Sequence, residues 1–229
     1  MNILKNKCLV WDFDNTLAKR DGLWSKSLMN VLSSNGHKNI DQNVISNYLK
    51  NGFPWHRYDE AHDSYMNNGW WQYIKILITK ALSAVGINED IDKLTKELKD
   101  EYMRIEAWSL FDETIESLEI SRNKGYANII LSNHIPELED IIEDLGLLEY
   151  FEAVFTFGKV GYEKPNKRIF EELYKNYRYE KYYMIGDSYK ADIIGAQNVG
   201  FSPILVRSKN DMNYEKYAQG LFGIWRYIE

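Results

Sequence analysis

The sequence has little cysteine, no basic tract and no long apolar run, and each absence excludes a class of protein. Cys8 is the only cysteine in 229 residues, so an intramolecular disulfide is impossible and a reducing compartment is favoured. The net charge is −6, without a basic run, which argues against nucleic acid as the main partner. No apolar stretch approaches the ~20 residues that span a bilayer, and the first one is broken at Asp12, too early for a signal peptide. We therefore predict a soluble, cytoplasmic protein with neither a nucleic-acid nor a membrane partner.

The composition that remains is that of a globular protein. Hydrophobic residues make up 45% of the chain and charged residues 27%, which excludes a collagen-like or fully disordered chain. At roughly 150 residues per domain, the length corresponds to about one and a half domains. This predicts a core domain that carries a modest insertion. The aromatic content, 14% with 7 Trp, is the one unusual value.

Short apolar runs alternate with helical patterns over most of the chain. Runs that are apolar on both faces are typical of parallel strands covered by helices. Amphipathic stretches at 135–145 and 167–177 lie between them. The alternation predicts an α/β fold with a doubly wound parallel sheet. The predicted strands are 8–11, 127–131, 153–157, 182–185 and 203–206.

Residues 19–108 interrupt this alternation. They contain helical stretches but no convincing β run, and they separate the first strand from the others by far more than an ordinary loop. We predict an all-helical domain at 19–108, inserted into a core formed by 1–18 and 109–229. Four of the seven tryptophans lie well inside the insertion: Trp24, Trp55, Trp70 and Trp71.

Polar side chains follow several predicted strands, at the point where each strand ends. Because the carboxyl ends of parallel strands share one edge of the sheet, and ligands bind at that edge, these side chains should meet in one crevice. Carboxylates so close together repel one another, so a divalent cation is expected, and ligands that are all oxygen favour Mg²⁺. The residues are Asp12, Asp14, Ser132, Asn133, His134, Lys164, Asp187 and Asp192.

Asp12 and Asp14 are two residues apart, so their side chains point to the same side of an extended backbone. One can attack an electrophile while the other moves a proton, and a carboxylate that takes up a phosphoryl group becomes an aspartyl-phosphate. Lys164 and the Ser132 hydroxyl would neutralise charge on the transferring oxygens. The pattern therefore indicates phosphoryl transfer.

Four ordered motifs resemble those of the haloacid dehalogenase-like hydrolase superfamily. They are Asp12-Phe13-Asp14-Asn15-Thr16, Ser132-Asn133, Lys164-Pro165, and Gly186-Asp187-Ser188 through to Asp192. The stretches around Lys164 and Asp192 extend the resemblance to subfamily I, which places a helical cap between the first two motifs. The resemblance implies a Rossmann-like core, and the presence of Asp14 implies the metal-dependent phosphatase branch rather than the true dehalogenases.

The resemblance also implies a role for each motif residue. Asp12 would be the nucleophile and Asp14 the general acid and base, while Ser132, Asn133 and Lys164 would bind the phosphoryl group. Mg²⁺ would be held by Asp12, the backbone carbonyl of Asp14, and Asp187. Asp192 would either reach the metal through water or orient Lys164. Thr16 either belongs to the site or only shapes the turn. His134 departs from the small residue that is commoner at its position, and it either faces the phosphate or only begins a helix.

The cap offers only candidates for substrate contact. His56 and Arg57 are favoured, ahead of Phe53, Trp55, Trp70 and Trp71. The function expected is that of a Mg²⁺-dependent phosphohydrolase acting on a small phosphorylated metabolite. Two alternatives stay open: a phosphomutase of a sugar phosphate, and a non-catalytic phospholigand-binding module. The sequence does not indicate the substrate or the oligomeric state.

Overall fold

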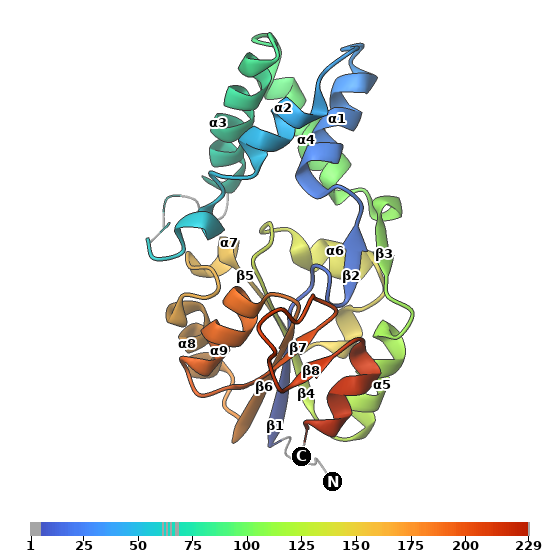
Figure 1. Ribbon diagram of the computed structural model, residues 1–229, viewed down its shortest axis with the longest axis vertical. Helices are drawn as coiled ribbons and strands as arrows, with labels where there is room; N and C mark the ends of the chain where they lie inside the picture. The colour runs from blue at the N-terminus through green and yellow to red at the C-terminus, as the bar shows by residue number, and fades with distance from the viewer. Residues whose placement is uncertain (1–5, 61, 63, 65, 67–68, 229) are drawn as a thin grey trace.

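The structure is a computed structural model that describes residues 6–60, 62, 64, 66 and 69–228. The first five residues of the predicted core, five residues of the predicted insertion and the last residue lie outside the described residues. Figure 1 shows an α/β core with a helical cap above it, joined by two strands that run side by side. In the described part of the chain, no helix is long and apolar enough to cross a membrane.

The core is built on a six-stranded sheet in the order β5-β4-β1-β6-β7-β8, in which each neighbouring pair is parallel. This confirms the predicted fold class and the five predicted strands. The edge strand β8 is new; two residues are too few to show a pattern. The strands are β1 (Lys7–Trp11), β4 (Ala127–Ser132), β5 (Ala153–Thr156), β6 (Lys181–Gly186), β7 (Ser202–Val206) and β8 (Tyr217–Ala218).

Strand β1 lies near the middle of the sheet and is buried on both faces. Because alternate side chains of a strand point to opposite faces, Cys8 and Val10 join one apolar cluster and Leu9 and Trp11 the other. The first cluster includes apolar residues of α8, and the second includes those of α5 and α6. Helices therefore cover both faces, which fixes β1 and the residues directly after it.

The helices of the core follow the strands. The predicted helix 135–145 is α6, which begins at Leu138 because Pro136 and Glu137 form the turn before it. The predicted helix 167–177 is α8, whose first turn is capped by the Asn166 side chain, which accepts from the Arg168 N–H at 3.0 Å. The core helices are α5 (Thr114–Asn123), α6 (Leu138–Asp144), α7 (Phe157–Val160), α8 (Lys167–Asn176) and α9 (Gly195–Gln197). Shorter helical turns are η4 (Leu148–Tyr150), η5 (Tyr189–Ile194) and η6 (Leu221–Arg226).

The cap consists of helices that pack around aromatic side chains. Trp24 stacks on Tyr102 with ring centroids 4.2 Å apart, and Phe53 stacks on Trp55 at 4.4 Å. Part of the aromatic excess is thus explained by packing within the cap. The helical insertion between β2 and β3 is confirmed. Its elements are α1 (Leu23–Ser34), α2 (Gln42–Leu49), η1 (Pro54–Arg57), α3 (Gly69–Ala84), α4 (Ile91–Met103) and η3 (Ile105–Ala107).

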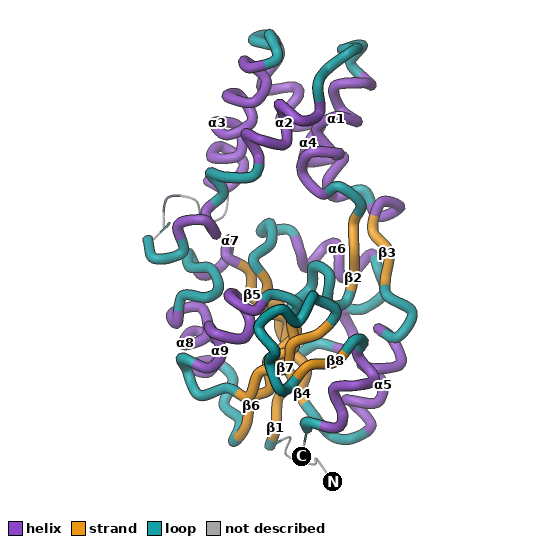
Figure 2. Tube along the Cα trace, in the orientation of Figure 1, coloured by secondary structure: helices purple, strands orange, loops and turns teal. Residues whose placement is uncertain are grey.

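The margins of the insertion are not helical, and the prediction that it contains no β structure is wrong there. Strand β2 (Ala18–Arg20) pairs antiparallel with β3 (Trp108–Leu110), so that a two-stranded ribbon connects cap and core (Figure 2). Three residues are too few to show the alternation by which strands are recognised.

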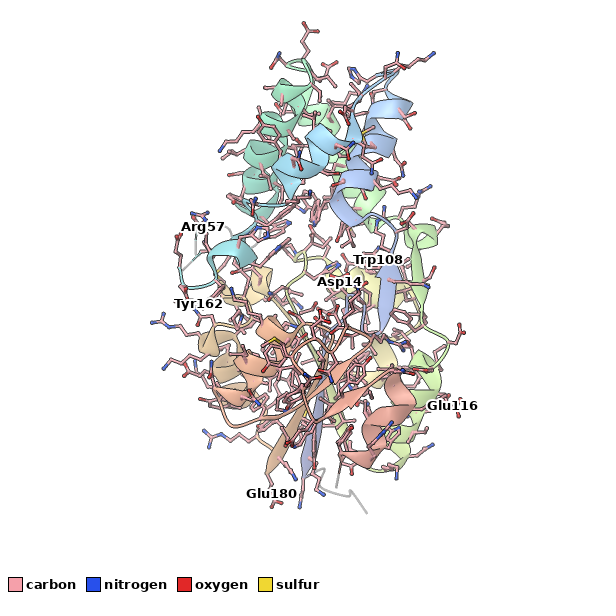
Figure 3. All side chains as sticks on the ribbon, viewed as in Figure 1. Asp14, Arg57, Trp108, Glu116, Tyr162 and Glu180 are labelled. Carbon is pink, nitrogen blue, oxygen red and sulfur yellow. The ribbon has the colours of Figure 1, made fainter. Side chains whose placement is uncertain are left out.

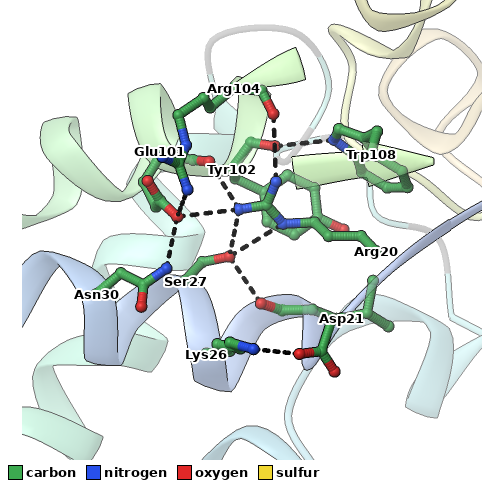
Figure 4. A network of polar contacts seen from close by, with 10 residues as sticks. Arg20, Asp21, Lys26, Ser27, Asn30, Glu101, Tyr102, Arg104 and Trp108 are labelled. Atoms are coloured by element: carbon green, nitrogen blue, oxygen red, sulfur yellow. Dashed lines mark hydrogen bonds and ion pairs between the residues drawn. The ribbon is translucent and has the colours of Figure 1, made fainter. Parts of the chain in front are cut away.

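Arg20 is buried at the junction of ribbon and cap (Figure 4). Its guanidinium donates to the Ser27 hydroxyl of α1 at 3.1 Å and to the Glu101 carbonyl of α4 at 2.8 Å. It also lies over the rings of Tyr102 and Trp108, 5.3 and 5.8 Å from their centroids. One side chain thus joins the strand that enters the cap to the first and last helices of the cap.

Candidate active site

The motif residues meet at the carboxyl edge of the sheet, beneath the cap. Asp12 directly follows β1, Ser132 is the last residue of β4, and Asp187 directly follows β6. Lys164 comes from the loop between α7 and α8. Figure 3 places Asp14 where the core faces the cap. The structure therefore brings the core residues into one crevice, as the rule for parallel sheets predicts.

Lys164 connects two carboxylates in the crevice. Its ammonium donates to Oδ1 of Asp12 at 2.7 Å and to Oδ1 of Asp192 at 2.6 Å, and the Ser132 hydroxyl donates to the same Asp12 oxygen at 2.8 Å. Burial alone would lower the pKa of Lys164, but Asp12 and Asp192 outweigh it and raise the pKa above its ordinary value. Lys164 therefore carries a permanent positive charge beside the Asp12 carboxylate.

Asp192 contacts both Lys164 and the backbone after β6. One of its oxygens accepts from Lys164 and the other accepts from the Ser188 N–H at 2.9 Å, so both are engaged by the protein. Gly186 gives it room, because a Cβ at that position would lie 2.2 Å from the Asp192 carboxyl. Of the two roles that the sequence left open for Asp192, these contacts support the orientation of Lys164.

The side chain of Asn133 holds the backbone of Lys164 from both sides. Its amide nitrogen donates to the Lys164 carbonyl at 2.9 Å, and its oxygen accepts from the Lys164 N–H at 2.8 Å. The predicted contact of Asn133 with phosphate stays a prediction. Thr16 is fully buried, and its N–H donates to the Phe13 carbonyl at 3.3 Å in the turn after β1.

Three carboxylates lie close enough to share a metal ion. Asp12, Asp187 and Asp192 each offer an oxygen within 4.8 Å of the others. Burial first, and then repulsion by Asp12 and Asp192, raise the pKa of Asp187 to about 8. Burial also raises the pKa of Asp192 to about 6, although Lys164 opposes it. Carboxylates so destabilised in their charged form fit a divalent cation, and an all-oxygen set suits Mg²⁺. The Asp14 carbonyl remains a predicted ligand.

Asp14 has the properties of a proton donor. Its side chain is 26% exposed, and it lies beside the pocket that holds Asp12. Burial and repulsion by Asp12 raise the pKa of Asp14 to about 8, with Lys164 acting in the opposite direction. A carboxyl that keeps its proton near neutral pH can serve as a general acid.

His134 lies directly behind Asp14. Its Nε2 is 3.9 Å from Oδ2 of Asp14, and the ring is only 2% exposed. Burial lowers the pKa of His134 to about 3, against a smaller opposing contribution from the backbone of Ile135. The imidazole is therefore neutral at physiological pH.

A pocket of about 330 Å³ opens from these residues toward the cap. Its core side includes Asp12, Asp14, Asn133, His134, Lys164, Lys190 and Asp192, and the cap contributes only aromatic and aliphatic side chains: Leu23, Trp24, Trp55, Tyr58 and Tyr102. This apolar wall faces a strongly charged floor. Such a pocket suits a ligand with an anionic head and an uncharged remainder.

The two foremost cap candidates do not line this pocket. His56 is exposed, with its ring 6.2 Å from that of Phe53, and Arg57 forms an exposed ion pair with Glu60 at 3.0 Å. Of the less favoured cap candidates, Trp55 does line the pocket, as does Tyr58, which was not a candidate. Sequence reasoning also missed Tyr102 and Lys190 as pocket residues. The only available signal was that Lys190 lies two residues before Asp192.

A family model for haloacid dehalogenase-like hydrolases matches residues 6–200. The chain belongs to this family. The position of the cap, inserted between β1 and β4, agrees with the subfamily I resemblance. Membership accounts for the order in which the four motifs occur along the chain.

Individual relatives of this haloacid dehalogenase-like hydrolase share different parts of it. A glyceraldehyde 3-phosphate phosphatase from Methanothermobacter thermautotrophicus is 40% identical over 103 residues, which cover 43% of the chain and 45% of that protein. The haloacid dehalogenase-like hydrolase domain-containing protein 3 from Homo sapiens is 25% identical over 89% of the chain and 82% of its own length. The chain thus spans less than half of the first relative.

The same architecture recurs in a magnesium-bound HAD-hydrolase, YfnB from Bacillus subtilis. The two structures superimpose with a TM-score of 0.78, covering 97% of this chain and 98% of that one. At 16% identity, this similarity concerns the fold alone.

This haloacid dehalogenase-like hydrolase also buries a carboxyl next to its active-site lysine. Glu163 is fully buried, and neither carboxyl oxygen has a hydrogen-bond partner among the described residues. His62 of the cap lies close by, with Nε2 3.9 Å from Oε2 of Glu163, and the backbone N–H of His62 donates to the Gly161 carbonyl at 3.2 Å. Burial raises the pKa of Glu163 from 4.5 to about 8, although Arg57 opposes the shift.

Glu163→Gln should become more stable than the natural protein as the pH rises. A carboxyl with a raised folded-state pKa contributes its stability fully below pH 4.5 and loses it as the pH rises through about 8. Glutamine does not titrate, so the difference in free energy of unfolding should grow by roughly 3–4 kcal/mol between pH 5 and pH 8 in favour of the variant. Urea unfolding at both pH values measures it, with the exposed Glu139→Gln as control. A difference that stays constant with pH would contradict the assignment.

Proposed function

We propose that the chain is a Mg²⁺-dependent phosphohydrolase that cleaves a small phosphomonoester through an aspartyl-phosphate on Asp12. One observation carries the proposal: the Asp12 carboxylate is held by Lys164 and Ser132, with a carboxyl that retains its proton two residues away at Asp14. A nucleophile, an acid and a fixed positive charge then meet at one point, which is what phosphoryl transfer requires.

In the first step, a carboxylate oxygen of Asp12 attacks the phosphorus and the bond to the leaving oxygen breaks. Asp14 gives its proton to that oxygen, so the alcohol leaves neutral. Lys164 and Ser132 stabilise the negative charge of the transferring group. Mg²⁺, held by Asp12, Asp187 and the Asp14 carbonyl, would supply further positive charge against the phosphoryl oxygens when bound.

In the second step, water replaces the alcohol. Asp14, now a carboxylate, takes a proton from the water as its oxygen bonds to phosphorus, and the bond between phosphorus and Asp12 breaks. Inorganic phosphate leaves, and both aspartates return to their first state. The apolar cap wall keeps other water away from the acyl-phosphate until then.

The comparisons support a small phosphorylated metabolite as substrate. The relative from Methanothermobacter thermautotrophicus is named a glyceraldehyde 3-phosphate phosphatase, and the pocket of about 330 Å³ lies at the small end of ligand sites. The match to that relative covers less than half of the chain, so we infer the leaving group from the cap side of the pocket instead. Its aromatic and aliphatic side chains favour an uncharged leaving group.

Metal removal should abolish phosphate release. With p-nitrophenyl phosphate and a panel of phosphorylated metabolites, we expect chelation by EDTA to lower kcat at least about 100-fold, because three carboxylates then repel one another and the phosphoryl charge. Added Mg²⁺ should restore activity, whereas Ca²⁺, with its larger coordination shell, should not. Activity that does not respond to chelation would overturn the metal assignment.

The two alternatives make different products. A phosphomutase would return the phosphoryl group to a sugar and depend on a bisphosphate activator, whereas a hydrolase releases inorganic phosphate. A non-catalytic binding module would release none from any substrate. The proton-holding Asp14 and the long insertion argue against the module, because a passive binder needs neither.

A further inference from the structure

His134 is a buried polar side chain whose two ring nitrogens are not satisfied by hydrogen bonds. Neither ring nitrogen makes a hydrogen bond of ordinary geometry with a described residue, and both are inaccessible to solvent. The Ile135 backbone makes only a smaller, opposing contribution to the pKa of the ring. An unpaired polar group in the interior costs about 1–3 kcal/mol, and such groups are rare in native structures. The fold does not depend on imidazole nitrogens here, because an apolar ring would fill the space without this cost.

The surroundings hold the ring in one place. Its centroid lies 5.6 Å from that of Phe13, 5.8 Å from Tyr102 and 5.4 Å from Trp108. These rings come from the β1 motif, from α4 of the cap and from β3 of the ribbon. The cage therefore fixes His134 from both core and cap.

One side-chain oxygen close to an imidazole nitrogen belongs to Asp14, the predicted general acid. Nε2 of His134 lies 3.9 Å from Oδ2 of Asp14, about 1 Å longer than a hydrogen bond. Catalytic hydrogen bonds are commonly long in ligand-free structures and shorten when substrate binds. The half-buried Asp14 side chain can rotate to make up the difference, whereas the caged His134 ring is held in place.

We propose that His134 is a positioning residue for Asp14, and that its Nε2–H donates to Asp14 Oδ2 when a phosphomonoester occupies the pocket. The proposal rests on the phosphohydrolase function argued above. His134 neither gains nor loses a proton in the reaction. Its bond turns the Asp14 carboxyl so that the other oxygen, which carries the acidic proton, faces the leaving oxygen.

The donated hydrogen bond also has an energetic consequence. As the bond between phosphorus and the leaving oxygen breaks, the proton passes from Asp14 to that oxygen and Asp14 becomes a carboxylate. A hydrogen bond to a charged acceptor is stronger than one to a neutral acceptor. His134 therefore stabilises the transition state more than the ground state, which is the condition for an effect on rate.

The test compares two substrates whose leaving groups differ in their need for a proton. p-Nitrophenolate leaves without help from an acid, whereas an alkoxide such as that of glycerol phosphate needs a proton. We expect His134→Phe to lower kcat/KM for the alkyl ester roughly 100-fold, the lower range of general acid catalysis, and to lower that for p-nitrophenyl phosphate less than about 5-fold. His134→Gln, which can place an amide N–H near Nε2, should keep the alkyl ester within about 10-fold of the natural enzyme.

Two comparisons separate positioning from packing. Trp108→Phe alters the packing around His134 but keeps the imidazole itself, and it should lower kcat/KM for both substrates equally. If His134→Phe does not fold, as shown by thermal unfolding, His134→Asn replaces it, because its shorter amide cannot reach Asp14. Equal losses on both substrates, or a Gln variant as impaired as Phe or Asn, would overturn the proposal. A natural enzyme that releases no phosphate from either ester would instead overturn the proposed function.

Discussion

Asp12→Asn should lower phosphate release by about 10⁴-fold or more, the scale on which enzymes lose activity with their nucleophile. An amide oxygen is a poor nucleophile, and an acyl-phosphate cannot form from it. The fold should survive, because Lys164 keeps its bond to Asp192 at 2.6 Å. Initial rates with p-nitrophenyl phosphate and Mg²⁺ measure the loss.

The matched control is Asp21→Asn. Asp21 is an exposed carboxylate that pairs with Lys26 near the base of the cap, so the same chemical change there should leave kcat within about 2-fold. The natural enzyme quenched in acid during turnover should also carry a covalent phosphate labile to hydroxylamine, and the Asp12 variant should carry none. An Asp12→Asn enzyme with turnover close to the natural rate would rule out the covalent mechanism.

Lys164→Met should cost the protein both stability and activity. The substitution leaves Asp12 and Asp192 facing each other in a buried site without the cation that lies 2.7 and 2.6 Å from them. Removing one partner from a buried ion pair typically costs 3–5 kcal/mol, so we expect the free energy of unfolding to fall by about 3 kcal/mol. Activity should fall at least about 100-fold, since the charge on the transferring oxygens then has no fixed partner.

Lys26→Met is the control for this second prediction. Lys26 also binds a carboxylate, Asp21, but its side chain is 50% exposed, and exposed pairs contribute only about 0–1 kcal/mol. Urea unfolding of both variants in chelator-treated buffer compares the two lysines without bound metal. A Lys164→Met variant that loses less than about 1 kcal/mol would show that the crevice tolerates its carboxylates unpaired.

The core residues of the site could be predicted from the sequence because a buried strand is recognisable from its own residues. An apolar run such as Cys8–Trp11 predicts its own burial, and the residues after it must then lie at the carboxyl edge of the sheet. Which role Asp192 takes could not be predicted, since it depends on distances to Lys164 and Ser188 that only packing defines. The deviation at His134 was visible in the sequence, but its closeness to Asp14 was not.

The sequence predicted that the cap is helical, but not which of its side chains face the core. Helical periodicity shows that α4 has an apolar face, yet it does not show that Tyr102 lies where this face meets the core. Charged residues are usually expected at the surface. That expectation gave no sign that Glu163 and Arg20 are buried.

The ribbon of β2 and β3 brings the two ends of the cap together. Ala18 lies opposite Leu110 and Arg20 opposite Trp108, so the insertion starts and finishes at the same point of the core. Because closing a loop costs only slowly more as the loop lengthens, residues can be gained or lost within the cap without moving β1 or β4. The cap can therefore vary in length and sequence as one unit, which would change substrate contacts while the residues at the carboxyl edge of the sheet keep their positions.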